Sequence, residues 1–299
     1  MLPIAAPYHA MNQLADLARP RVEIWRTVLG LILSEILTVL IVLTVVLPMM
    51  KILGPTDPRD PFNDGLNSNS AAGVIGLLFS FLPQMLGLIL AVQILMRRGL
   101  SSLTGPFGPV LSDFIRVGLP LMGLLMLLMP LSVQGDDVRQ NLTLAQLLPW
   151  LPAALLGLLI QTTTEELMFR GYLQQQLAGR FSARWVWLGL PTLLFGLAHY
   201  APHASGLMTA ATMFWAAGFG LIAADLTART GNLGAAIALH FTNNVSAILI
   251  VGLAGDLGGL TLYQVQVPAD DIGKTLMYLG LDGLGLLVSW LLARLILRC

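Results

Sequence analysis

Two adjacent acidic residues, Glu165 and Glu166, lie in an otherwise apolar stretch of the sequence and are followed by Arg170. Two neighbouring carboxylates in a low-dielectric site cannot both ionise cheaply unless a cation compensates one of them. Residues four apart share a helix face, so Arg170 is expected to neutralise Glu166. Glu165 then points about 100° away and is free to face a cavity. The alternative is a structural acid–base cluster that ends the helix.

Further polar residues occur at a compatible depth in two later apolar stretches. If the chain forms a helical hairpin near Ser182, Glu165 precedes the turn by 17 residues and His199 follows it by 17. At 1.5 Å per residue both lie about 25 Å from the turn, level with each other. His240 and Asn244 are four residues apart and share one helix face at a similar depth. The sequence therefore predicts convergence of an acid, a base and hydrogen-bond donors, as an active site requires.

Two other acidic residues in apolar stretches, Glu35 and Asp282, stand alone on their predicted helices. An ionisable side chain at the centre of a span costs roughly 2.5–3.5 kcal/mol, so each is a candidate functional residue. For both, a structural hydrogen bond between helices is the favoured interpretation.

The overall composition indicates whether these residues lie in a water-soluble domain or in a membrane. Of the 299 residues, 56% are hydrophobic and 11% are charged, whereas soluble domains average about 25% charged residues. A membrane-spanning helix needs about 20 apolar residues, and the sequence contains such runs at 27–49, 72–96, 114–133, 147–170, 185–201, 206–226, 233–252 and 275–297. The predicted fold is all-α: a polytopic integral membrane protein with about eight transmembrane helices in one bundle.

The charges fix an expected orientation and exclude some partners. Arginines gather in alternate connecting segments, which by the positive-inside rule places both termini in the cytoplasm. The 16 basic and 16 acidic side chains cancel, so nothing favours nucleic-acid binding. The single cysteine, Cys299, excludes an internal disulfide and a cysteine-based metal cluster.

Three segments resemble the motifs of a known family: Glu165-Glu166-Leu-Met-Phe-Arg170 (EExxxR), Phe195-Gly-Leu-Ala-His199 (FxxxH) and His240-Phe-Thr-Asn-Asn244 (HxxxN). Their order and spacing are similar to those of the CPBP family of intramembrane proteases, also called the ABI or type II CAAX prenyl endopeptidase family. The core that carries the resemblance covers roughly residues 145–252.

The resemblance implies an endopeptidase that hydrolyses a peptide bond of a membrane-associated substrate, of which a prenylated CAAX protein is one candidate. The roles that it implies are a general base that activates water (Glu165), its supporting charge pair (Glu166 and Arg170), a residue that orients or shares the water (His199) and an oxyanion site (His240 and Asn244). No cofactor is favoured.

Three alternatives remain open at this point. In a zinc-dependent version of the protease, Glu165, His199 and His240 are ligands of suitable type, although no HExxH pair is present. A proton-coupled transporter would also bury acidic and histidine residues, but matched broken helices in two halves are missing. A non-catalytic immunity or scaffold protein could retain the fold.

The expected organisation follows from these interpretations. Residues 1–26 form a cytoplasmic N-terminal segment, 27–140 hold three transmembrane helices, 141–255 form a four-helix protease-like core, and 256–299 hold an outer loop and the C-terminal transmembrane helix. The expected location is a bacterial inner membrane. The expected partners are the lipid bilayer and a membrane-associated peptide or protein substrate.

Overall fold

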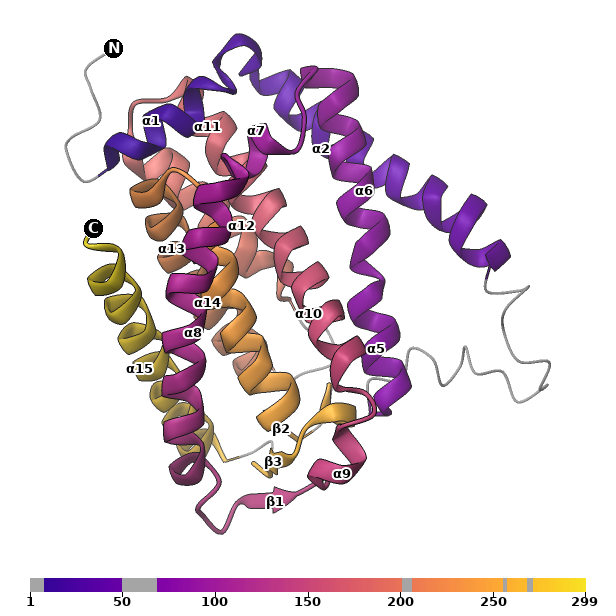
Figure 1. Cartoon of the computed structure of the whole chain (residues 1–299), viewed down its shortest axis with the longest axis vertical. Coiled ribbons are helices and arrows are strands. Elements are labelled where there is room, and N and C mark those ends of the chain that lie inside the picture. Colours follow the sequence, from indigo (N-terminus) through magenta and orange to yellow (C-terminus); the bar gives the residue numbers. More distant parts are fainter. Residues whose placement is uncertain (1–7, 50–68, 201–205, 255–256, 268–270) are drawn as a thin grey trace.

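The computed structural model describes residues 8–49, 69–200, 206–254, 257–267 and 271–299, and most of them form helices aligned along the long axis of the molecule (Figure 1). Within these ranges five helices are long and apolar enough to cross a membrane: Ile24–Met49, Ala71–Met96, Phe107–Ser132, Gly206–Thr230 and Ile272–Leu297. Two shorter apolar helices are Trp185–Ala198 and Gly234–Ile250. A helical integral membrane protein is therefore confirmed, whereas eight spanning helices in one bundle are not.

The helix that carries the acidic pair lies at the centre of the molecule. It comprises α10 (Leu151–Glu166), the π-helical segment η5 (Leu167–Gln174) and α11 (Gln175–Arg180), which follow one another without a break. The elements packed around it are α5 (Ala71–Phe79), α6 (Phe81–Ala91), α7 (Ser101–Thr104), α12 (Leu190–Ala198), α13 (Gly206–Thr230) and α14 (Gly234–Val245). A helix with this many polar side chains is stable in a membrane only when protein surrounds it.

The helix continues to Arg180, ten residues beyond the predicted apolar span 147–170. The helix continues because the glutamines beyond it find acceptors in neighbouring elements: Gln174 Nε2 donates to the Ala224 carbonyl at 2.9 Å and Gln175 Nε2 donates to the Leu14 carbonyl at 2.8 Å. Buried polar groups are tolerated when they are hydrogen-bonded. The following turn spans residues 181–183, as the hairpin near residue 182 requires.

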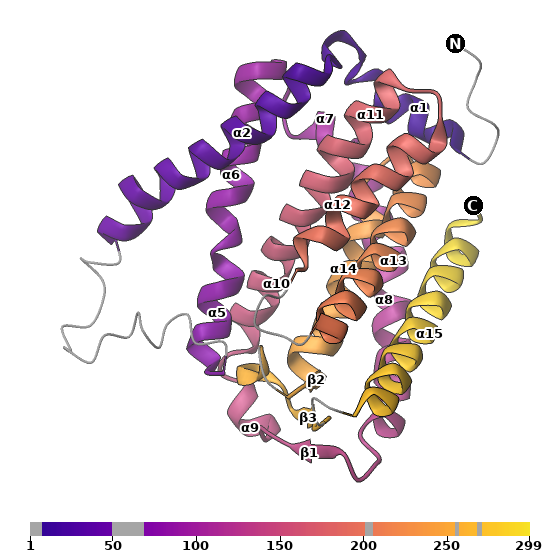
Figure 2. The same ribbon diagram turned by 180° about the vertical axis from the view of Figure 1, so that it is seen from behind.

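Helices α8 (Phe107–Ser132) and α15 (Ile272–Leu297) cover the side of α14 that faces away from α10 (Figures 1 and 2). The remaining short helical elements are η2 (Arg19–Arg21), η3 (Val42–Val46), η4 (Val92–Met96), α9 (Leu144–Leu147), η6 (Trp185–Gly189), η7 (Ser246–Ile250) and η8 (Gly258–Leu260). The largest hydrophobic core lies between the central helix and α13 and α14.

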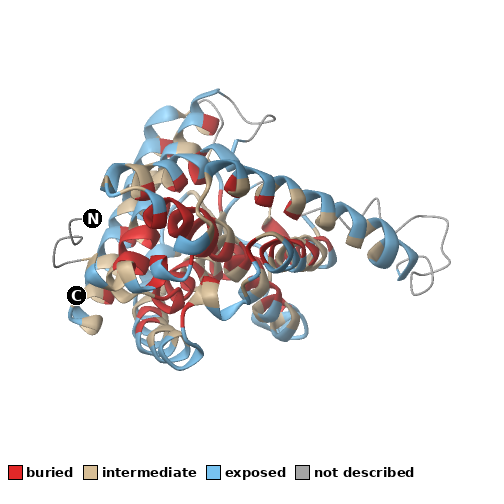
Figure 3. Ribbon diagram, turned by 90° about the horizontal axis from the view of Figure 1, so that it is seen from above, coloured by how far each residue is buried: buried red, intermediate tan, exposed pale blue. Residues whose placement is uncertain are grey.

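Helix α2 (Ile24–Ile41) departs from the predicted single bundle. It packs against α6, and its far end then diverges from the other helices; Figure 3 shows most of its surface exposed. The contact with α6 depends on Gly87, because a Cβ there would lie 2.7 Å from the Ser34 carbonyl oxygen and would also collide with the Thr38 hydroxyl. Small residues let membrane helices approach this closely.

The N-terminal segment contains a helix, α1 (His9–Asp16), that packs on α11 and α13. Met11 of this helix is fully buried in a cluster with Trp187. The Tyr8 hydroxyl donates to Asp225 Oδ1 at 2.7 Å, and burial, together with this carboxylate, raises the pKa of Tyr8. Helix α1 and the C-terminal end of α15 lie at the same end of the molecule (Figure 1).

The fold is almost entirely helical, as predicted, and a small three-stranded sheet closes the opposite end (Figure 1). Its central strand β3 (Tyr263–Val265) pairs antiparallel with β1 (Val138–Gln140) and parallel with β2 (Val251–Leu253). Beside it, Lys274 Nζ donates to Asp137 at 2.5 Å, and this hydrogen bond lowers the pKa of Asp137. The sheet joins the connections that leave α8 and α14 to the one that enters α15.

Replacing Gly87 with valine should separate α2 from α6. The added side chain collides with the backbone of α2, and such overpacking costs about 1–3 kcal/mol. Unfolding of the purified protein in detergent should show this loss. The matched control is Gly123→Val on α8, where a Cβ has nothing within 4 Å; an equal loss in both variants would contradict the close contact.

Candidate active site

The Glu166 carboxylate binds two basic groups from two different elements. Arg170 Nη1 donates to Glu166 Oε1 at 2.9 Å, so the ion pair expected from the four-residue spacing is present. His240 Nδ1 lies 2.8 Å from the same oxygen, and because an ionised carboxylate only accepts hydrogen bonds, Nδ1 donates. The side chains of Glu166 and Arg170 are 0% and 1% exposed. Glu166, the last residue of α10, thus connects Arg170 of η5 with His240 of α14.

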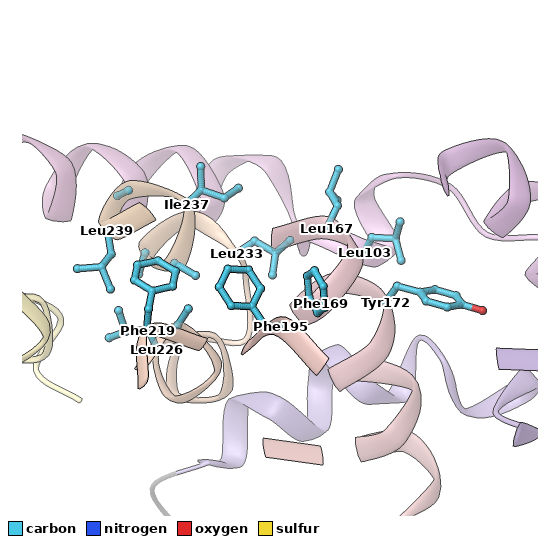
Figure 4. Close-up of a cluster of buried hydrophobic side chains, with 14 of the residues drawn as sticks. Leu103, Leu167, Phe169, Tyr172, Phe195, Phe219, Leu226, Leu233, Ile237 and Leu239 are labelled. Carbon is cyan, nitrogen blue, oxygen red and sulfur yellow. The ribbon is translucent and has the colours of Figure 1, made fainter. Parts of the chain in front are cut away.

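Arg170 is enclosed on its other sides as well. Its Nη2 donates to the Gly220 carbonyl of α13 at 3.1 Å, and its guanidinium lies 4.5 Å from the centre of the Phe195 ring. Phe169 packs edge-on against Phe195 with ring centres 4.9 Å apart, and Figure 4 shows both rings in the hydrophobic cluster with Phe219. These aromatic rings keep water away from the buried ion pair.

Glu165 differs from Glu166 in its surroundings, although the two are adjacent. Its side chain is 15% exposed and lines a cavity of about 380 Å³. Its Oε2 lies 3.7 Å from His240 Nε2 and has no hydrogen-bond donor among the described residues. Its Oε1 accepts from Gln161 Nε2 at 2.6 Å. Glu165 therefore faces the cavity, and its Oε2 atom is left to accept a proton.

Gln161 also binds Asn244, which it links to Glu165. Asn244 Nδ2 donates to Gln161 Oε1 at 2.8 Å, and Asn243 Nδ2 donates to Asn244 Oδ1 at 3.2 Å. The sequence interpretation missed Gln161. The signal was its position four residues before Glu165, on the same face of α10.

His199 reaches the same cavity from the end of α12. Its Nδ1 lies 2.8 Å from the Phe195 carbonyl oxygen, and because a carbonyl only accepts, Nδ1 carries a hydrogen and donates. Nε2 is then the nitrogen that can accept a hydrogen bond from a cavity molecule when the ring is neutral. Glu165 and His199 are thus brought together, as their equal distances from the hairpin turn predict.

Helix α6 supplies a wall of the cavity that the sequence interpretation did not foresee. The lining residues are Phe81, Gln84, Thr164, Glu165, Met168, Phe169, Ala198 and His199. Phe81 and Gln84 come from the second predicted span, outside the segment that carries the family motifs. An amide side chain within an apolar span was the available signal, because such groups face protein or a cavity rather than lipid.

The structure brings together all six predicted site residues, whereas two other candidates lie elsewhere. Glu35 is on the exposed surface of α2 and Asp282 is on α15, and neither lines the cavity. The zinc alternative needs Glu165, His199 and His240 around one ion. Within the described ranges no three such side chains are placed to hold a metal. We therefore derive no step through a metal.

The fold and this site define a helical membrane protein with a buried acid–base cluster beside a cavity. Residues 147–246 match the Rce1-like family model, whose description is type II CAAX prenyl endopeptidase Rce1-like. The matched segment comprises 100 of the 299 residues. The predicted resemblance is confirmed for this segment, which matches the family model and contains all six predicted site residues. No curated protein and no solved structure matches the chain.

Removing the guanidinium by Arg170→Gln should strongly destabilise the protein, since it leaves a buried carboxylate with only His240 as a basic partner. Breaking a buried pair costs about 3–5 kcal/mol. The control is Arg116→Gln, because Arg116 is 53% exposed and pairs with Asp113 at 3.8 Å; a surface pair contributes at most about 1 kcal/mol. Similar losses in the two unfolding curves would show that the Arg170 pair is not structurally important.

Proposed function

We propose that this protein is an intramembrane endopeptidase that hydrolyses a peptide bond of a membrane-associated substrate, with Glu165 as the general base. The observation that carries this proposal is the contrast between the two adjacent acids. Glu166 is fully buried and paired with Arg170, whereas Glu165 lines the cavity with one oxygen that lacks a donor among the described residues. The match of residues 147–246 to a peptidase family supports the same assignment.

In the first step, a water molecule in the cavity attacks the carbonyl carbon of the scissile peptide bond. Glu165 takes one proton from that water as the new carbon–oxygen bond forms. His199 orients the water, since its Nδ1 is bound to the Phe195 carbonyl and its Nε2 can accept. The electron pair of the carbonyl moves to its oxygen and produces a tetrahedral oxyanion.

Two groups of α14 are placed to stabilise this oxyanion. Asn244 keeps one Nδ2 hydrogen that is not used in its bond to Gln161. His240 donates from Nε2 when that nitrogen carries a hydrogen, as an imidazolium whose Nδ1 is held by Glu166. Preorganised donors in a low-dielectric site are usually the largest single contribution to such catalysis. The intermediate collapses as Glu165 returns the proton to the leaving nitrogen, and the carbon–nitrogen bond breaks.

The substrate class and location extend this proposal. A CAAX-type substrate, prenylated near its C-terminus, is the first to test because of the family match. We place the protein in a bacterial inner membrane with both termini cytoplasmic. The distribution of arginines supports this orientation, and so does the position of α1 and the end of α15 at one end of the molecule.

The test is cleavage of a prenylated CAAX peptide and of unmodified membrane peptides by the purified protein in detergent. Glu165→Gln keeps the shape of the side chain but removes the base, so the rate should fall about 10²–10⁴-fold. A chelator should leave the wild-type rate unchanged. Glu35→Gln, which alters a carboxyl on α2 outside the cavity, should retain the wild-type rate.

Each other result has a definite meaning. Loss of activity in chelator would replace the proposed mechanism with the zinc-dependent one. Full activity in Glu165→Gln would remove Glu165 as the base. If the wild type cleaves no member of a broad peptide panel, the endopeptidase proposal fails in favour of the scaffold or transporter alternatives.

A further inference from the structure

We propose that Gln161 is a positioning residue that holds the general base and the oxyanion donor in one fixed arrangement. The proposal rests on the function proposed above. Gln161 lies on α10 and is 7% exposed. One end of its amide binds Glu165 at 2.6 Å and the other end binds Asn244 at 2.8 Å. Among the described residues, no other side chain is hydrogen-bonded to both Glu165 and Asn244.

The direction of these hydrogen bonds is determined by the carboxylate. An ionised carboxylate only accepts, so Gln161 must turn its NH₂ group towards Glu165. Its carbonyl then faces Asn244, which must present its own NH₂ group in turn. The Asn244 carbonyl is left to accept from Asn243 Nδ2 at 3.2 Å. The charge on Glu165 therefore determines that Asn244 turns its NH₂ group, and not its carbonyl oxygen, towards Gln161.

This fixed direction has a catalytic consequence. An asparagine amide that could rotate by 180° would present an oxygen to the developing oxyanion in half of its orientations, and oxygen repels it. Gln161 prevents this rotation because its carbonyl accepts a hydrogen bond from Asn244 Nδ2. Such bonds are stronger in a buried, low-dielectric site than in water.

Gln161 also gives the two oxygens of Glu165 different surroundings. Oε1 accepts from Gln161, while Oε2 lies on the side of His240 without a donor among the described residues. Gln161 thereby holds the side-chain rotamer of the base beside the cavity. It acts through Glu165 and Asn244, so its removal should change the rate of the chemical step rather than substrate binding.

The test replaces Gln161 with methionine, which has similar length and fits an apolar helix but cannot form either hydrogen bond. We expect kcat to fall about 10–100-fold, the scale of a misplacement of about 1 Å, with KM within about twofold of wild type. The matched control is Gln176→Met. Gln176 is also buried on the same long helix, but its amide contacts the sulfur of Met96, so kcat should be retained.

A double-mutant cycle tests the coupling directly. If Gln161 acts through Asn244, the combined Gln161→Met and Asn244→Ala variant should lose less activity than the product of the two single losses. A purely structural role for Gln161 would give independent, multiplicative losses. Wild-type kcat in Gln161→Met, or an increase in KM alone, would also overturn the proposal.

A spectroscopic measurement decides the inference even if no substrate is cleaved. With ¹⁵N-labelled asparagine, the side-chain amide signal of Asn244 is identified by its loss in Asn244→Ala. This signal should shift in Gln161→Met and remain in place in Gln176→Met. An unchanged signal in Gln161→Met would reject the positioning role, whereas absence of cleavage by the wild type would reject only the proposed function.

Discussion

The site depends on one buried carboxylate, Glu166, that accepts hydrogen bonds from Arg170 and His240 on the same oxygen. An unpaired charge in the interior of a membrane protein is costly, and a pair is tolerated only with good geometry and further hydrogen bonds. Here Arg170 also binds the Gly220 carbonyl. The carboxylate thus ties the central helix to α14, and Arg170 ties it to α13.

This constraint explains why adjacent acids can have different functions. Glu166 is held between two basic groups, so Glu165 is left to bind Gln161 and to face the cavity. The pair of Glu166 with Arg170 carries no net charge, which lowers the cost of its burial. The π-helical segment begins directly after Glu166, and such segments are frequent at functional sites.

The sequence predicted the central features of the site for a physical reason. Charged groups in apolar helices are costly, and their spacing on a helix is regular, so Glu165, His199 and His240 could be placed at one level. It did not predict that Gln161 binds Asn244 or that Gln84 lines the cavity, because neutral amides are common in helices and these neighbours come from distant segments. Their contacts depend on packing that no local pattern encodes.

The errors in the predicted fold have similar causes. Lipid and protein interior are both apolar, so hydrophobicity could not show that α2 diverges from α6 beyond Gly87. The predicted apolar span stops at residue 170, whereas the helix continues because backbone acceptors on α13 and α1 bind Gln174 and Gln175. Strands of three residues, such as β3 (Tyr263–Val265), are too short for an alternating pattern to be recognised.

The central claim is that Glu166 holds His240 through Nδ1, and it can be tested without a substrate. The chain contains only four histidines, so ¹⁵N-histidine labelling gives a simple spectrum. We predict one strongly downfield Nδ1–H proton, typical of a histidine bound to a carboxylate, that disappears in Glu166→Gln and persists in Glu165→Gln. A spectrum without this proton, or one in which Glu165→Gln removes it and Glu166→Gln does not, would contradict the account.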